Sequence, residues 1–307
     1  MNPALRPVVD AIKAQVTEEV KGARQANKAI PVSGTRHTLP LEGRDIDMVY
    51  YPASREKAPL LMCFHGGGFL FGGCALDDSV WNAMRNQLDV NIASIDYRKT
   101  PEYMFPAPIE DAYDSAIYLK AHAEEFGFNP EHISVCGNSA GANISAAVCL
   151  MAKEKGGIRF DYQIMNYPFV DAATDPADKP LGNLDDALMY VFNELYVKPE
   201  DAKNIYCSPA FATKEQLTGL PTAIIYTADK DSLKAEGLKF AEQLKEAGVT
   251  VYCGTAEGMP HGYFEYGFGT AMGQDFLADS IKAQIADGSI AKAAQEALDF
   301  IDEHYVR

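Results

Sequence analysis

Short apolar runs alternate with longer amphipathic stretches along most of the chain. In the longer stretches, at residues 77–88, 109–126, 140–153 and 233–247, apolar side chains recur at the three- and four-residue spacing of a helix. Strands separated by helices form a mostly parallel sheet with helices on both faces. The pattern therefore predicts an α/β fold with a mostly parallel central sheet. The predicted strands are residues 46–51, 60–64, 90–96, 133–136, 162–167, 223–227 and 249–253.

Two stretches depart from this alternation. Residues 1–45 have the spacing of one or two amphipathic helices without a partnering strand, and residues 171–212 separate two strands by more than a crossover needs. A connection of that length is uncommon unless it forms a lid or a binding element. We expect the two stretches to form a helical cap over a core of residues 46–170 and 213–307.

Composition narrows the classes of function. The 307 residues, of which 47% are hydrophobic, suffice for one large α/β domain with an appended element. A net charge of −16 argues against nucleic acid and membrane surfaces as partners, because both are anionic. We see neither a signal-peptide pattern nor an apolar run near the roughly 20 residues of a membrane helix, so we expect a cytoplasmic protein. The scattered cysteines favour buried thiols over disulfides or a zinc site.

The motif GNSAG at residues 137–141 is the first candidate for chemistry, because it follows a predicted strand and begins a predicted helix. A G-x-S-x-G serine at such a turn exposes its hydroxyl, and the helix N-terminus favours negative charge nearby. The pattern alone also fits an ordinary glycine-rich turn. The strand–turn–helix context favours Ser139 as a nucleophile, with Gly137 and Gly141 permitting the tight turn.

A second glycine-rich motif, HGGGF at residues 65–69, follows the predicted strand 60–64. Its glycines leave backbone N–H groups unshielded, as an oxyanion site requires. The motif lacks the Lys-Ser/Thr pair of a P-loop, and its spacing is not that of a dinucleotide site. We expect Gly67 and Gly68, together with Ala140 after the serine, to form an oxyanion hole.

A serine nucleophile needs a histidine base and a carboxylate that orients it, and on this type of fold both follow the serine in the order acid, histidine. Only two of the six histidines follow Ser139. His261 comes after a predicted strand, at the carboxyl end of the sheet, whereas His304 lies in a predicted C-terminal helix. We therefore predict His261 as the base. For the acid, Asp229 and Asp231 follow the same strand, and the pattern does not separate them.

With these motifs assembled, the chain resembles the hormone-sensitive-lipase-like carboxylesterases, also called the α/β-hydrolase fold-3 group. The resemblance covers nearly the whole chain and includes DYRKTPE at residues 96–102, FPA at 105–107 and DSLKAEG at 231–237. The first aspartate of the last stretch is the family's triad acid, so the resemblance selects Asp231. It implies an α/β-hydrolase fold and hydrolysis of short- to medium-chain esters through an acyl-enzyme, with a small-molecule ester substrate, no cofactor and no metal.

The resemblance also assigns supporting positions and shows departures. Asn138 stands where the family commonly has Asp, and Ser232 where it has Pro. Residues 264–290 form an unusually long stretch, which fits an extra wall over the site, a dimer contact within a homo-oligomer, or a surface excursion. The positions assigned to support the two motifs are His65, Gly66, Gly137 and Gly141. The pocket candidates are Phe69, Asn138 and four aromatic residues of the cap, Tyr190, Phe192, Tyr196 and Phe211.

Two other functions fit the same fold. An amidase or acyltransferase would use the same residues, but we identify no acidic or basic specificity pocket in the sequence. A non-catalytic ligand-binding receptor is the other alternative, because plant hormone receptors related to this family lose the triad histidine. The presence of Ser139, Asp231 and His261 together argues against a receptor.

Overall fold

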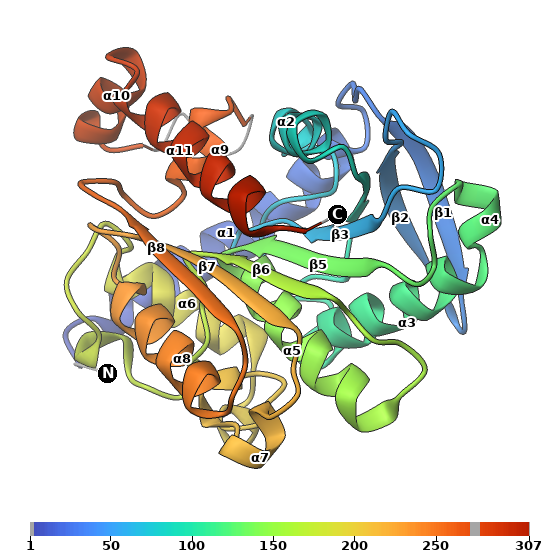
Figure 1. Ribbon diagram of the computed structural model, residues 1–307. Helices are drawn as coiled ribbons and strands as arrows, with labels where there is room; N and C mark the ends of the chain where they lie inside the picture. Colours follow the sequence, from blue (N-terminus) through green and yellow to red (C-terminus); the bar gives the residue numbers. More distant parts are fainter. Residues whose placement is uncertain (1–2, 271–276, 307) are drawn as a thin grey trace.

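The computed structural model describes residues 3–270 and 277–306, and within them it contains an eight-stranded sheet with the order β1-β2-β4-β3-β5-β6-β7-β8 (Figure 1). Strand β2 is antiparallel to both of its neighbours, and the other neighbouring pairs are parallel. The predicted mostly parallel α/β sheet is confirmed. The strands are β1 (Thr35–Leu41), β2 (Arg44–Tyr51), β3 (Leu60–Phe64), β4 (Asn91–Ile95), β5 (Ile133–Asn138), β6 (Tyr162–Asn166), β7 (Thr222–Ala228) and β8 (Val251–Ala256).

Helices cover both faces of the sheet, because successive residues of the central strands point to opposite faces and nearly all of them are apolar. In β3, Leu60 and Met62 belong to an apolar cluster that includes residues of α3, α5 and α8, while Leu61 and Cys63 belong to a cluster that includes residues of α2 and α11. The helices are α1 (Arg6–Asn27), α2 (Asp78–Leu88), α3 (Ala107–Ala121), α4 (Ala123–Phe126), α5 (Ala140–Lys155), α6 (Asp186–Tyr196), α7 (Lys214–Leu217), α8 (Lys234–Glu246), α9 (Tyr263–Gly267), α10 (Asp279–Ala286) and α11 (Ser289–His304).

The N-terminal stretch differs from the prediction of helices alone. Helix α1 ends at Asn27, and residues Thr35–Leu41 form strand β1, which pairs with β2 at the edge of the sheet. Only Leu39 of this strand is buried, so its sequence lacks the apolar pattern of an inner strand. Pro40 is tolerated because an edge strand needs fewer ladder hydrogen bonds. The turn into β2 contains Gly43 at φ +73°, a conformation that favours glycine.

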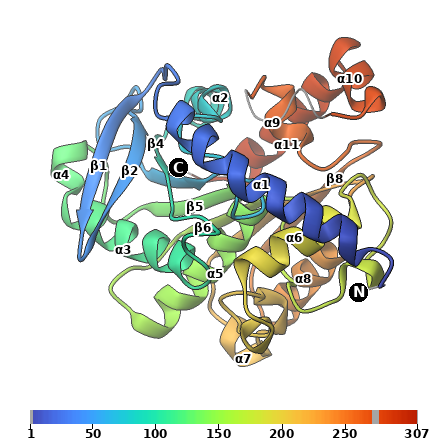
Figure 2. The same cartoon turned by 180° about the vertical axis from the view of Figure 1, so that it is seen from behind.

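Helix α1 lies along α6 on the side of the molecule seen in Figure 2. The two helices share an apolar cluster that includes Val9, Val16 and Val191 and is separate from the clusters on the two faces of the sheet. Arg6 and Lys13 both form ion pairs with Glu194. We call these two helices the α1–α6 pair. None of the helices in the described ranges combines the length and the apolar character needed to cross a bilayer.

Candidate active site

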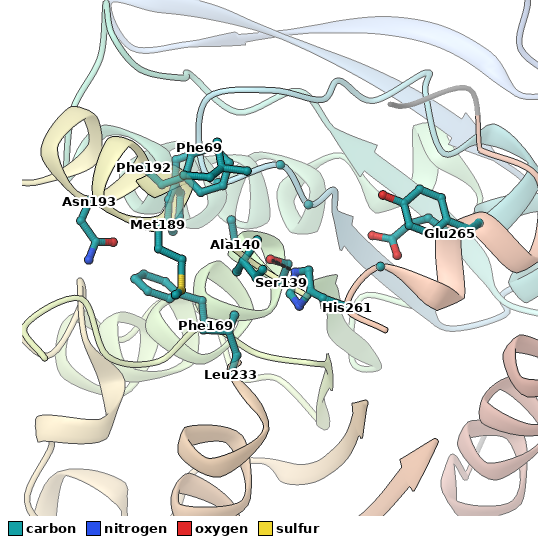
Figure 3. Close-up of a pocket in the computed structure, with 17 residues that line it drawn as sticks. Phe69, Ser139, Ala140, Phe169, Met189, Phe192, Asn193, Leu233, His261 and Glu265 are labelled. Atoms are coloured by element: carbon teal, nitrogen blue, oxygen red, sulfur yellow. Dashed lines mark hydrogen bonds between the residues drawn. The ribbon is translucent and has the colours of Figure 1, made fainter. Parts of the chain in front are cut away.

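A cavity of about 150 Å³ lies at the carboxyl ends of strands β3, β5, β7 and β8 (Figure 3). The residues predicted for the triad and the oxyanion hole each follow one of these strands, so the parallel sheet brings them together at one edge. The residues that line the cavity are Gly66, Gly67, Gly68, Phe69, Ser139, Ala140, Phe169, Leu184, Leu188, Met189, Phe192, Asn193, Leu233, His261, Gly262, Glu265 and Tyr266.

Ser139 occupies the tight turn between β5 and α5, with its backbone at φ +54°. The glycines on either side of Ser139 are required because the backbone around them leaves no room for a Cβ atom. A Cβ on Gly137 would lie 2.2 Å from the backbone of Gly141, and a Cβ on Gly141 would lie 2.0 Å from the carbonyl oxygen of Phe64. A strained, left-handed serine at a strand-to-helix turn is the geometry that directs a hydroxyl into a site.

Three side chains form a hydrogen-bonded chain in the cavity. His261 Nε2 lies 2.8 Å from Ser139 Oγ, and His261 Nδ1 lies 2.8 Å from Asp231 Oδ2. Because an ionised carboxylate only accepts hydrogen bonds, Nδ1 carries the proton in the neutral imidazole and Nε2 accepts from the serine hydroxyl. Burial by itself would lower the pKa of His261, but the charge and hydrogen bond of Asp231 outweigh it and raise the pKa above its usual value.

The two aspartates that the sequence pattern left undecided have different partners in the structure. The Asp231 side chain is fully buried, and its second oxygen accepts the N–H of Leu233 at 2.9 Å. Asp229 instead pairs with two lysines, Lys230 and Lys234, at 2.8 Å each. These hydrogen bonds to lysine hold the pKa of Asp229 well below its usual range. Only Asp231 therefore contacts the histidine.

Two residues that the sequence analysis did not assign hold His261 in place. Asn183 Oδ1 accepts the backbone N–H of His261 at 2.7 Å, and the Asn183 N–H bonds the carbonyl of Lys230. The ring of Tyr167 packs edge-on against the imidazole, with 4.9 Å between the centroids. Tyr167 follows β6 directly, at the same sheet edge as the other site residues. That position after a predicted strand was the only sign in the sequence that Tyr167 could belong to the site. Asn183 lies in the insertion of residues 171–212, and nothing in the sequence pointed to a role for it.

The glycine-rich loop after β3 depends on glycine at two positions that line the cavity. Gly67 has φ +110° and Gly68 has φ +61°. A Cβ on Gly68 would lie 2.4 Å from the ring of Phe192, so a larger residue would collide with α6 as well as strain the backbone. Below the loop, His65 is buried and stacks on Tyr97 with 4.3 Å between the ring centroids. The Tyr97 hydroxyl donates to the His65 carbonyl at 2.8 Å.

Some of the predicted pocket residues line the cavity and others do not. Phe69 lines the cavity and stacks on Tyr196, and Phe192 also lines it. Asn138 lies outside the lining, because its side chain is buried behind the serine, where Oδ1 accepts from Asn166 Nδ2 at 2.9 Å. Three of the four cap aromatics are likewise absent from the lining, namely Tyr190, Tyr196 and Phe211.

The long stretch of residues 264–290 contributes to the site through its first residues. Glu265 and Tyr266, both in α9, line the cavity, which agrees with an extra wall over the site. The rest of the stretch leads to α10, and residues 271–276 lie outside the described residues. The sequence analysis did not identify Glu265, because a single glutamate in an aromatic run gives no sign that it is buried.

Comparison with known proteins places this geometry in a family. A family model described as alpha/beta hydrolase fold matches residues 61–265. Esterase LipI of Mycobacterium tuberculosis is 29% identical and aligns with 87% of this chain and 88% of its own. Carboxylesterase NlhH of the same organism is 34% identical, with 71% and 70% covered. The solved structure of a thermostable esterase from Pseudomonas putida ECU1011 is 28% identical, superposes with a TM-score of 0.74, and aligns with 98% of this chain and 92% of its own. The chain belongs to the α/β-hydrolase fold family, in its hormone-sensitive-lipase-like fold-3 group.

Proposed function

We propose that this protein is a carboxylesterase that hydrolyses short- to medium-chain carboxylic esters through Ser139, His261 and Asp231 and an acyl-enzyme intermediate. The observation that carries the proposal is the hydrogen-bonded chain of these three side chains inside a cavity bordered by the glycine-rich loop. The esterase names of the relatives support the same class of reaction.

The first half of the reaction forms the acyl-enzyme. Ser139 Oγ attacks the ester carbonyl carbon while its proton moves to His261 Nε2, and Asp231 stabilises the imidazolium that results. The carbonyl oxygen becomes an oxyanion, which accepts hydrogen bonds from the N–H groups of Gly67, Gly68 and Ala140. One such donor contributes roughly 3 kcal/mol to transition-state stabilisation. The tetrahedral intermediate collapses when His261 donates its proton to the alcohol oxygen and the C–O bond breaks.

The second half repeats these steps with water. His261 takes a proton from a water molecule, whose oxygen attacks the acyl carbon, and the same N–H groups hold the new oxyanion. The proton then returns to Ser139 Oγ as the acid leaves. The proton transfer between Ser139 and His261 is supported by the 2.8 Å distance between Oγ and Nε2.

The size and lining of the cavity favour small substrates. At about 150 Å³ it is smaller than the roughly 300–1,000 Å³ of sites for drug-sized ligands. Leu188, Met189 and Phe192 of α6 form part of its apolar lining. We propose that α1 and residues 171–212 act as the cap over this acyl pocket, because α1 packs on α6 and α6 reaches the cavity.

Labelling and turnover together test the proposal. A fluorophosphonate probe should label the wild-type protein and the control Ser54→Ala, which changes an exposed serine, but not Ser139→Ala. A panel of p-nitrophenyl esters of increasing chain length, run beside an amide analogue, should show turnover of the short esters and its loss in Ser139→Ala. An unlabelled wild-type protein would indicate a receptor, and preferential cleavage of the amide would indicate an amidase.

A further inference from the structure

The cavity has two chemically different sides. Figure 3 shows Glu265 on one side of Ser139 and His261, and the labelled apolar side chains on the other. The leaving alcohol must take its proton from His261, which lies on the Glu265 side of Ser139 in Figure 3. We therefore place the alcohol portion toward Glu265 and the acyl group on the apolar side. The labelled apolar residues on that side are Phe69, Phe169, Met189, Phe192 and Leu233, and the polar Asn193 lies beyond Met189.

One carboxyl oxygen of Glu265 accepts a hydrogen bond, and the other lies beside the glycine-rich loop. The side chain is 3% exposed, and Oε2 accepts a hydrogen bond from the Tyr167 hydroxyl. Oε1 lies 3.2 Å from the point where Gly66 would carry a Cβ, and that point is 3.6 Å from Ser139 Cβ. Because Gly66 has no side chain, no Cβ stands between Oε1 and Ser139.

The surroundings of Glu265 favour its neutral form. Burial and the nearby Asp77 carboxyl raise the pKa of Glu265 to about 8, although the Tyr167 hydrogen bond and His261 oppose the shift. From α11, the residues nearest Gly267 of α9 are Ala294, Ile290 and Ala291, none of which is titratable. A neutral carboxyl in such a position donates a hydrogen bond. The titratable groups that act on Glu265 or are acted on by it are Asp77, Tyr167, His261, Tyr263 and Tyr266.

We propose that Glu265 is a specificity-determining residue that recognises a hydrogen-bond acceptor in the alcohol portion of the ester. This inference rests on the proposed esterase function. With Oε2 engaged by Tyr167, the carboxyl proton at Oε1 donates to an ether or hydroxyl oxygen of the alcohol. Esters of alkoxyalkyl or hydroxyalkyl alcohols are therefore preferred over plain alkyl esters. When the carboxyl ionises it can no longer donate, and it repels the same oxygen.

A pair of nearly isosteric esters tests the inference. The measured quantity is the ratio of kcat/KM for 2-methoxyethyl acetate to kcat/KM for butyl acetate, in which the titration of His261 cancels because both esters need the same base. Near pH 7, Glu265→Met should lower the ratio about two- to tenfold, the effect of one hydrogen bond. Glu265→Gln keeps an N–H donor and should keep the ratio. In the wild type the ratio should fall as pH rises from about 7 to about 9, through the pKa near 8, whereas Glu265→Gln should show no such fall.

Controls separate this inference from the function on which it rests. Glu257→Gln changes an exposed glutamate and should leave the wild-type ratio and its pH dependence unchanged. A wild-type ratio that does not change with pH overturns the inference, even if Glu265→Met fails to fold. Turnover of both esters with the same ratio in Glu265→Met overturns the inference alone. No turnover of either ester by the wild type overturns the proposed function and this inference together.

Discussion

Replacing Asp231 by Asn tests the assignment of the acid, which the sequence pattern alone left open. Asn has nearly the same shape as Asp but no charge. It can also donate from its NH₂ group to His261 Nδ1, which favours the wrong tautomer. The matched control is Asp229→Asn, two residues earlier, because Asp229 contacts lysines and not the histidine.

The size of the effect follows from the geometry. During attack, the imidazolium charge forms beside Asp231, with 2.8 Å between Nδ1 and Oδ2. Two unit charges about 4 Å apart at an effective dielectric constant of about 20 attract each other by about 4 kcal/mol. A loss of that size is about a thousandfold in rate. The wrong tautomer adds to it, so kcat should fall by about 10³- to 10⁴-fold.

The assay is the steady-state hydrolysis of p-nitrophenyl butyrate, with thermal unfolding of each variant as a check on folding. Asp229→Asn should keep kcat/KM within roughly threefold of the wild type, because Asp229 does not contact the histidine and its partly exposed ion pairs contribute little. If Asp229→Asn loses more activity than Asp231→Asn while both remain folded, the assignment of Asp231 is wrong.

Two further predictions concern the oxyanion loop and the base. Gly68→Ala should lower kcat/KM about a hundredfold or more, because the new Cβ meets Phe192 and displaces the N–H group that we propose as an oxyanion donor. Gly127→Ala, also at positive φ but with open space around it, should leave kcat/KM unchanged. The raised pKa of His261 should place the acid limb of the kcat/KM profile above pH 6.5, since the base must be neutral. That limb should move to lower pH in Asp231→Asn, and a wild-type limb below pH 6.5 would contradict the role given to the carboxylate.

The central sheet could be predicted from sequence because its inner strands are nearly continuous apolar runs. The residues of β3 and β5 are all buried, so the pattern and the fold coincide there. Strand β1 is exposed, carries Pro40 and resembles a loop in its residue types. The turn at Glu42-Gly43, whose glycine has positive φ, was the local signal for a hairpin that pattern reading passed over.

Motif order predicted Ser139 and His261 at strand ends on one edge of the sheet, where their side chains meet, but it could not give the contacts of each carboxylate. Asp231 is fully buried and meets His261, which is 30 residues away in sequence. Asp229 is partly exposed and meets lysines that are close to it in sequence. The same limit applies to Glu265. Its hydrogen-bond partner, Tyr167, is 98 residues away in sequence, and burial of the pair follows from the packing of α9 against the sheet.

The separate apolar cluster of the α1–α6 pair has a consequence for how the protein can open. The buried side chains of α1 all belong to this cluster, so α1 can unfold locally at a lower free energy than the whole domain, whereas Tyr196 also joins α6 to the cluster on the sheet. The ion pairs of Arg6 and Lys13 with Glu194 are partly exposed, so salt weakens them more than it weakens the buried core. Ionic strength therefore acts more on these two helices, which we propose as part of the cap, than on the hydrogen-bonded side chains of Ser139, His261 and Asp231 at the strand ends.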